Sequence, residues 1–176
     1  MNLPSPDALR APSPDTMDVE SLLDHILAAY HQKHRAELPD LVALARKVER
    51  VHHDVPEAPL GLGDALEHVA ADLESHMQKE EQVLFPAMRQ GLGGALAQPI
   101  SMMRSDHEDH AQCIAEIERL TRGYAVPAGA CGSWQRLYAG VESLCAELRE
   151  HIRIEDDILF PRFEILGHTR CTCAHG

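Results

Sequence analysis

The sequence contains one phrase twice, and each copy places a histidine and a glutamate on one face of a predicted helix. HMQKEEQVLFPAM begins at His76, and HIRIEDDILFPRF begins at His151. In both copies a glutamate follows four residues after the histidine, at Glu80 and Glu155, and the apolar stretch ends in Leu-Phe-Pro. Residues four apart are neighbours on one side of a helix. The repeat therefore predicts two matching helices, each with a polar pair on one face.

Apolar residues that recur at spacings of three and four predict four helices. The helices are expected to begin near Asp18, Asp64, Pro99 and Ser133, with Pro/Gly-rich joints between them. Asp64, with Glu67 three residues on, resembles a capping box. The faces predicted to point inward are Leu27, His31, His34, Leu38, Leu41, Ala45 and Val48; Leu66, Val69, Leu73, His76, Glu80 and Val83; Ile100, Met103, His107, His110, Ile114 and Ile117; and Leu137, Val141, Leu144, Leu148, His151, Glu155 and Ile158. Such helices with short joints favour an all-α, up-down-up-down four-helix bundle.

The composition agrees with a single helical domain. Hydrophobic residues make up 44% of the 176 residues and aromatic residues only 4%, and β-branched runs are few, which favours helices over strands. The proline-rich residues 1–17 are expected to be a disordered arm. Residues 18–165 are expected to form the bundle, and residues 166–176 a flexible tail.

The polar residues on the predicted inward faces need partners. Six histidines and two glutamates lie there, and a carboxylate buried without a partner is costly. His31 precedes His76 by 45 residues, and His107 precedes His151 by 44. At a rise of about 1.5 Å per residue, these four histidines can lie near one level of the bundle. The chain is therefore interpreted as one helical hairpin used twice, with a histidine on its first helix and the polar pair on its second.

This arrangement predicts a centre for two metal ions. If both carboxylates bridge, each ion receives two histidines and two oxygens, an oxo or hydroxo bridge adds a fifth ligand, and one position stays open. Imidazole and carboxylate without thiolate favour iron or manganese, whereas zinc prefers four ligands. The alternative is ordinary polar residues with hydrogen bonds. One His-x-x-x-Glu pair alone would favour that alternative, but two copies with matching upstream histidines favour metal.

Five segments carry a resemblance to a known family: YHQKHRAELP (30–39), KVERVH (47–52), HMQKEEQVLFP (76–86), PISMMRSDH (99–107) and HIRIEDDILFP (151–161). Over about residues 18–163, they resemble the hemerythrin-like di-iron proteins, most closely the Repair of Iron Centres family. The resemblance implies two iron ions bound by His31, His76, Glu80, His107, His151 and Glu155, with both glutamates bridging. Members of that family typically begin with a small domain that holds a Cys-Cys motif. Here we expect only an arm of about 16 residues before the first helix, which weakens a repair role and leaves the metal site unaffected.

The resemblance also implies a role in nitrosative or oxidative stress, through iron-sulfur cluster repair, nitric oxide handling or iron donation. We expect open iron positions to bind nitric oxide or an oxygen-derived ligand. No flavin or nicotinamide motif is visible in the sequence, so turnover would need an electron-donating partner protein, and a damaged iron-sulfur protein would be the client of repair. The alternatives are a non-enzymatic module that stores or senses oxygen or nitric oxide, and a helical adaptor with zinc or no metal.

Charge and hydropathy exclude other classes of partner. A net charge of −12 with neutral histidines argues against nucleic-acid binding, which needs clustered Lys and Arg. No stretch reaches the roughly 18 apolar residues of a membrane span, and the first residues lack a basic-then-apolar signal region. We therefore expect no membrane association and a cytoplasmic location, where the five cysteines would be reduced thiols.

Several polar residues fall outside the predicted ligand set. His34 and His110 lie one turn from predicted ligands, and a solvated or core-edge position is expected for them, with a fifth-ligand role as the alternative. A solvated face is expected for three acidic residues, Glu81, Asp156 and Asp157. The tail contains an H-x-x-C-x-C-x-H pattern, made of His168, Cys171, Cys173 and His175. It is expected either to bind a metal or act as a redox pair, or to be a loose tail with incidental thiols.

Overall fold

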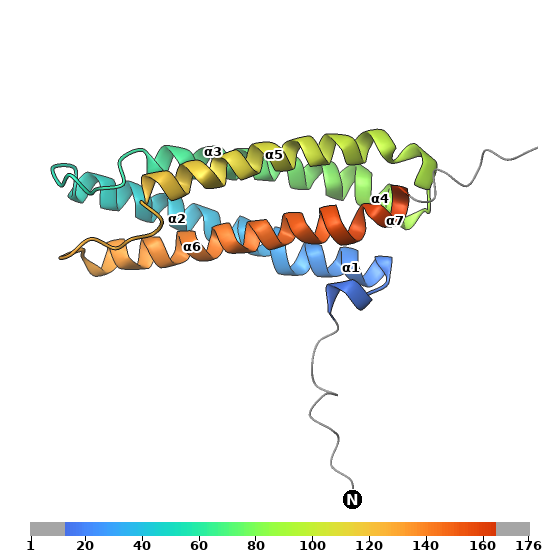
Figure 1. Ribbon diagram of the computed structural model, residues 1–176, viewed down its shortest axis with the longest axis horizontal. Helices are drawn as coiled ribbons and strands as arrows, with labels where there is room; N and C mark the ends of the chain where they lie inside the picture. The colour runs from blue at the N-terminus through green and yellow to red at the C-terminus, as the bar shows by residue number, and fades with distance from the viewer. Residues whose placement is uncertain (1–12, 165–176) are drawn as a thin grey trace, which may run out of the picture.

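A computed structural model describes residues 13–164, and within that range all regular structure is helical (Figure 1). The first long helix is α1 (Val19–Ile26), η3 (Leu27–His31) and α2 (Gln32–Val51), and the second is α3 (Leu62–Lys79), η4 (Glu80–Leu84) and α4 (Phe85–Arg89). The third is α5 (Ala97–Leu120), and the fourth is α6 (Gly132–Arg153), η6 (Ile154–Leu159) and α7 (Pro161–Glu164). Short 3₁₀ turns, η2 (Pro14–Thr16) and η5 (Gly93–Ala95), lie outside these helices.

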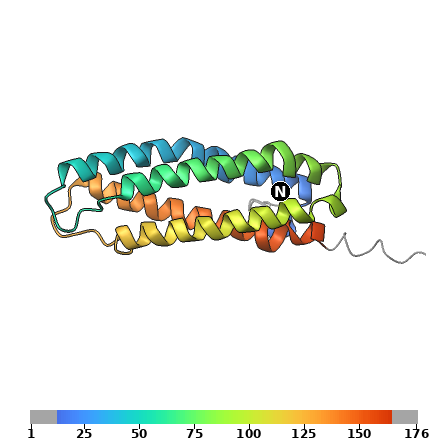
Figure 2. The ribbon, with the colours of Figure 1, turned by 90° about the horizontal axis from the view of Figure 1, so that it is seen from above.

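The four long helices lie side by side and alternate in direction, as Figures 1 and 2 show. In the contacts between them, α2 packs against α3 and α6, and α5 packs against α3 and α6. This closed square is the geometry that helices with short connections adopt when each buries one face. The predicted all-α, up-down-up-down bundle is confirmed.

The helix ends show one agreement and one correction. α1 begins after Asp18, whose carboxylate accepts a hydrogen bond of 2.8 Å from the Ser21 backbone N–H, as an N-cap does. The predicted capping box at Asp64 is wrong, because α3 begins two residues earlier, after Gly61 in a left-handed conformation with φ of 93°. Glu49 of α2 accepts from the backbone N–H of Gly61 at 3.0 Å and of Gly63 at 2.9 Å. A side chain from the neighbouring helix therefore satisfies the free N–H groups at this helix start.

Three of the long helices contain a π-helical segment, which the sequence patterns did not indicate. In η4 the Phe85 N–H bonds to the Glu80 carbonyl, and in η6 the Phe160 N–H bonds to the Glu155 carbonyl at 2.8 Å. Both bonds span five residues rather than the four of an α-helix. In both copies of the repeated phrase a proline follows directly, and its missing N–H removes the next donor. The Leu-Phe-Pro endings thus mark the ends of two π segments.

Two hydrophobic clusters fill the bundle, one on each side of the polar level. One cluster comprises residues of α2, α3, α5 and α6, including Leu66 and Ile114, and the other gathers residues of α1, α4, α5, η6 and α7, including Ile100 and Phe160. Along α5 the order is apolar, polar, apolar, since His107 and His110 lie between Met103 and Ile114. The polar level is therefore shielded from water at both ends.

Some expectations concern residues beyond the described range. The first twelve residues and the tail with its His168, Cys171, Cys173 and His175 pattern lie outside the described residues, so their roles and the domain limits stay predictions. Among residues 13–164, none of the helices combines the length and the apolar character needed to cross a bilayer.

Cys131, directly before α6, is expected to be the most reactive of the three described cysteines. Its exposed thiol accepts from the Trp134 backbone N–H and lies 3.2 Å from His52 Nε2, and these contacts lower its pKa to about 7. Burial raises the pKa of Cys113 and Cys145. Because the thiolate is the nucleophile, iodoacetamide should modify Cys131 first, with half its maximal rate near pH 7. Peptide mass spectrometry over a pH series measures this, and equal rates at Cys145 would contradict it.

Candidate metal centre

The six side chains predicted to bind metal converge between the two hydrophobic clusters. All six are buried, with at most 4% of their surface exposed. Their donor atoms form two groups in which all atoms lie within 4.8 Å of one another, and Glu155 belongs to both. The groups are His31, Glu80, His151 and Glu155, and His76, His107 and Glu155. The helical pairs and the upstream histidines of the repeated phrase thus meet at one place.

Each glutamate faces one histidine from either group. Glu155 Oε1 lies 3.0 Å from His151 Nε2, and Glu155 Oε2 lies 3.1 Å from His107 Nε2. Two oxygens of one carboxylate therefore address two different histidines, which is the arrangement of a bridging ligand. The corresponding distances from Glu80 Oε2 are 3.3 Å to His31 Nε2 and 3.4 Å to His76 Nε2.

The residues fit a metal centre, because most of these donor atoms have no hydrogen-bond partner in the described part of the chain. Within residues 13–164, no hydrogen bond of acceptable geometry reaches His31 Nε2, His107 Nε2, Glu155 Oε2 or either carboxylate oxygen of Glu80, although all are buried. Buried polar atoms are seldom left without a partner, and a buried carboxylate is especially costly. A divalent cation would satisfy all of them, since imidazole nitrogen and carboxylate oxygen are ligands of first-row transition metals.

In three of the four imidazoles, the ring nitrogen that faces away from the two glutamates is hydrogen-bonded to a carboxylate. His31 Nδ1 lies 2.8 Å from Glu81 Oε1, His76 Nδ1 lies 3.3 Å from Asp106 Oδ2, and His107 Nδ1 lies 3.1 Å from Asp156 Oδ1. A carboxylate can only accept, so Nδ1 carries a proton, and Nε2, which faces the two glutamates, is the nitrogen left to bind a metal. Each carboxylate is bound in turn by a cation: Arg35 donates to Glu81, Lys79 to Asp106 and Arg104 to Asp156.

The fourth imidazole has no such support. His151 Nδ1 lacks a hydrogen-bond partner in the described part of the chain. The ring of Tyr30 instead stacks on it, with 5.0 Å between centroids and 9° between planes. Two other rings, those of Phe85 and Phe160, stack on His31 and His107, at 5.8 Å and 5.9 Å.

The solvated face predicted for the acidic residues is therefore wrong for two of the three. Glu81 and Asp156 are about three-quarters buried and support histidines, whereas Asp157 is exposed as expected. A sequence signal for them exists in the repeated phrase. In both copies a second acidic residue directly follows the pairing glutamate, and in both it bonds to the upstream histidine. The repeat thus encodes, in each copy, one carboxylate that faces the converging histidines and one that supports a histidine.

A comparison with known proteins agrees with this site. The model of the hemerythrin HHE cation binding domain matches residues 22–164, which include all six converging residues. This chain belongs to the hemerythrin HHE cation-binding family. The iron-sulfur cluster repair protein YtfE of Pectobacterium atrosepticum is 42% identical over 141 residues, 80% of this chain and 64% of the relative. The proteins of the same name from Citrobacter koseri and Escherichia coli O81 are 42% and 44% identical, over 84% and 80% of this chain and 67% and 64% of their own lengths.

The predicted resemblance to hemerythrin-like proteins and to iron-sulfur cluster repair proteins is confirmed. This hemerythrin-family chain spans 64% of the length of the first of these relatives. What the whole relatives do is therefore carried to this chain only as a proposal.

The electrostatics of the hemerythrin-like centre favour a bound positive charge. Burial works against protonation of His107, but Asp156 and Glu155 outweigh it and raise its pKa to about 10. Burial would raise the pKa of Glu155, but the facing His151 and His107 lower it well below the ordinary value. The cluster thus draws in protons to balance its carboxylates. A metal ion must displace those protons, so metal affinity should fall as the pH falls.

His34 and His110 are buried, at 0% and 2% exposure, so of the solvated or core-edge positions expected for them the solvated one is wrong. Neither ring nitrogen of His34, nor Nδ1 of His110, has a hydrogen-bond partner among the described residues. Burial, with the nearby His151 and His76 respectively, lowers their pKa to about 4 and about 3. Both imidazoles are therefore neutral beside the hemerythrin-like centre, with nitrogen atoms free to accept or donate.

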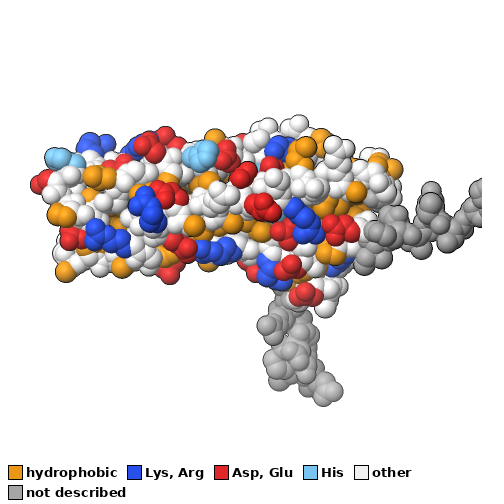
Figure 3. All heavy atoms as spheres, turned by 45° about the horizontal axis from the view of Figure 1, so that its top comes forward, with side chains coloured by type: hydrophobic (Ala, Val, Ile, Leu, Met, Phe, Trp, Pro, Cys, Tyr) orange, Lys and Arg blue, Asp and Glu red, His pale blue; other side chains and the backbone are white. Residues whose placement is uncertain are grey.

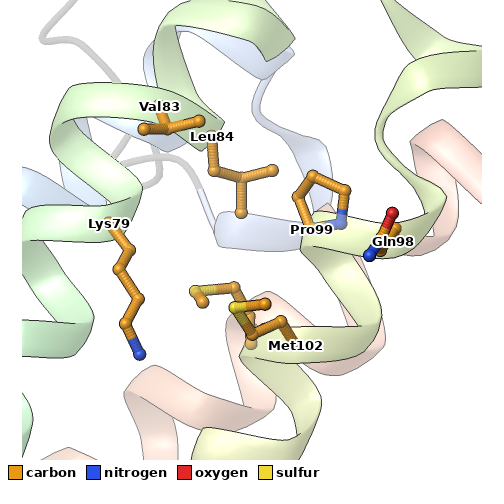
Figure 4. Close-up of a pocket in the computed structure, with 7 residues that line it drawn as sticks. Lys79, Val83, Leu84, Gln98, Pro99 and Met102 are labelled. Atoms are coloured by element: carbon orange, nitrogen blue, oxygen red, sulfur yellow. The ribbon is translucent and has the colours of Figure 1, made fainter.

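An apolar pocket of about 280 Å³ lies between the start of α5 and the α3–η4 junction. Figure 4 shows the side chains of Leu84, Pro99 and Met102 gathered around the same space, with Lys79 at its side. Leu84 lies one turn after Glu80, and buried Met103, which also lines the pocket, lies one turn before His107. The pocket therefore approaches the hemerythrin-like centre through apolar side chains.

Replacing Asp156 by Asn tests the supporting carboxylates. The amide keeps the shape but loses the charge that orients and polarises His107, and loss of such a partner typically lowers metal affinity about 10–100-fold. A competition titration with a chromophoric chelator measures the affinity. Asp157→Asn, the same change at the exposed neighbour, should leave the affinity within about twofold, since surface changes are nearly neutral. Equal affinities of both variants would contradict the role of Asp156.

Proposed function

We propose that this chain is a non-haem di-iron protein of the cytoplasm that binds nitric oxide or oxygen-derived ligands during nitrosative or oxidative stress. The observation that carries the proposal is the sharing of Glu155 between two groups of buried donor atoms. Carboxylates shared by histidine-bearing helices are the means by which four-helix bundles hold two adjacent metal ions.

The proposal assigns one ion to His31 and His151, the other to His76 and His107, and both carboxylates to both ions. Iron suits this mixed imidazole and carboxylate set, which contains no thiolate. Bound iron, with an oxo or hydroxo bridge, would supply the redox and ligand-binding chemistry. The chain itself orients the imidazoles through Glu81, Asp106 and Asp156 and excludes water with the two hydrophobic clusters.

The apolar pocket supports an uncharged diatomic ligand. Its lining is mostly hydrophobic, and it lies one helical turn from both Glu80 and His107. Neutral gases can enter such a pocket without losing hydrogen bonds to water, whereas anions would lose their hydration. We therefore assign this side of the bundle to ligand entry and the larger cluster on the opposite side to stability.

A role in iron-sulfur cluster repair is proposed from the relatives. Proteins named iron-sulfur cluster repair protein YtfE are 42–44% identical to this chain. Donation of iron to a damaged cluster would need a client protein, and redox turnover would need an electron donor. Figure 3 shows acidic and basic side chains interspersed over one face. A mixed surface of this kind suits transient protein partners more than a polyanion.

The second candidate function is storage or sensing of oxygen or nitric oxide without turnover. The apolar pocket beside the buried residues supports it, because a neutral ligand can bind and leave there without a partner protein contacting the centre. This candidate predicts reversible ligand binding with no product.

The experiment measures metal content and then ligand turnover. Protein purified without added metal should contain about two irons per chain, as expected for a dinuclear bundle site, and a stoichiometric zinc content would contradict the proposal. The reduced protein is then mixed with nitric oxide in a stopped-flow instrument, with an excess of a chemical reductant that supplies the two electrons consumed per nitrous oxide, and the products are analysed for nitrous oxide. Sustained nitrous oxide formation excludes pure storage, and fully reversible binding without product excludes turnover. Absence of any spectral change on mixing would overturn both candidates.

A further inference from the structure

A second group of metal-type side chains lies on the surface between α3 and α5. Among residues 13–164, His68, Asp72 and Cys113 form the one convergent group outside the buried centre, with donor atoms within 4.8 Å of one another. His68 and Asp72 are four residues apart on α3, and Cys113 faces them from α5. His68 Nε2 lies 3.2 Å from Asp72 Oδ2. None of the three takes part in the centre described above.

The three donors specify a class of ion. A thiolate, an imidazole and a carboxylate together suit zinc, cobalt(II) or iron(II), whereas magnesium and calcium take oxygen ligands. His68 and Asp72 are 67% and 42% exposed, and Cys113 is partly buried. An ion held by three protein ligands keeps a position open to water and can exchange.

A polar pocket adjoins this group on the side of the buried centre. Asp72 also lines this pocket of about 160 Å³, together with Asp106, Asp109 and His110. His110 is 2% exposed, and within the described chain its Nδ1 has no hydrogen-bond partner. Asp106 contacts His76 of the centre. Carboxylates and an unpaired imidazole therefore continue from Asp72 toward the buried histidines.

We propose that His68, Asp72 and Cys113 form an outer site for a divalent transition-metal ion, beside a polar pocket that Asp72 shares with Asp106 and His110. The site does not require the buried centre to hold iron. Its donors converge from two helices whose packing is fixed by the core, so an ion would need no rearrangement of the backbone.

Cobalt(II) is the probe, because its bond to a thiolate absorbs in the near ultraviolet and the buried centre contains no thiol. The full chain carries Cys171→Ser and Cys173→Ser, so that the tail thiols do not contribute. Cobalt titration should produce a saturable thiolate-to-cobalt band. Cys113→Ser should abolish the band, and His68→Ala should weaken binding at least about tenfold, the loss seen even for outer-shell partners. Cys131→Ser and His53→Ala, at an exposed cysteine and an exposed histidine, are the matched controls and should leave the band unchanged.

Residue-resolved alkylation gives a second measurement that needs no variant. Saturating cobalt should slow alkylation of Cys113 at least about tenfold and leave Cys131 unaffected, as read by peptide mass spectrometry. The proposal is overturned if no thiolate band forms, if the band survives Cys113→Ser, or if cobalt leaves alkylation of Cys113 unchanged.

Discussion

Replacing Glu155 by Ala should prevent the protein from holding either of the two metal ions that we propose. Glu155 is the residue shared by the two groups of donor atoms, at 3.0 Å from His151 and 3.1 Å from His107. Without it each ion loses a negatively charged ligand, and the buried histidines lose their counter-charge. We expect metal affinity to fall by at least about 100-fold, the upper end of what even outer-shell partners cost. Elemental analysis after anaerobic loading with ferrous iron measures the occupancy.

The same change should lower the stability of the metal-free protein. Breaking a buried charge pair by removing one partner typically costs about 3–5 kcal/mol, and chemical denaturation measures it. Glu150→Ala is the matched control, because Glu150 lies five residues earlier on the same long helix with 46% of its side chain exposed. That variant should keep its iron and its stability. Retention of two irons by Glu155→Ala would refute the assignment of Glu155 as a shared ligand.

Replacing Leu66 by Ala should destabilise the bundle without affecting its metal content. Leu66 is fully buried in the cluster on the far side from α1, ten residues before His76. Removing a buried leucine side chain costs about 2–5 kcal/mol, from lost burial and from the cavity left behind. Denaturation of the metal-free protein measures this cost without the contribution of bound ions.

Leu60→Ala is the control for this change, since Leu60 is 53% exposed and its loss should cost less than about 0.5 kcal/mol. The folded fraction of Leu66→Ala should load as much metal as the wild type. Equal loss of stability in both variants would mean that this cluster does not carry the fold. Loss of metal from folded Leu66→Ala would mean that the centre depends on distant packing.

The sequence predicted the inward faces almost completely, and the three exceptions have one cause. Leu27, Val83 and Ile158 were expected to point inward, but Val83 is 60% exposed and the other two are only partly buried. All three lie in π segments, η3, η4 and η6. A π turn takes one residue more than an α turn, so the inward position moves on by one. Leu84 and Leu159 accordingly occupy the buried places.

The convergence of the six donor residues was also predictable, because equal spacing in two hairpins brings equivalent residues to one level. The supporting shell was not predicted. Asp106 has no counterpart in the repeated phrase, and its role depends on α5 packing against α3. His34 and His110 were placed on inward faces, but their complete enclosure was not predicted, for a related reason. A histidine on a helix is usually partly solvated, and only the packed bundle shows that both rings are enclosed.

The uneven support of the four imidazoles bears on the order in which two ions would depart. In the pair of His76 and His107, each imidazole is hydrogen-bonded to a carboxylate that is itself bound by a Lys or Arg side chain. In the pair of His31 and His151, only His31 has such a carboxylate, and His151 stacks on the ring of Tyr30. The side of His151 should therefore give up its ion first, and a chelator should strip the protein in two kinetic phases. A chain built in this way would release one of the two proposed ions while the second, held by His76, His107 and the two glutamates, still joined the second, third and fourth long helices.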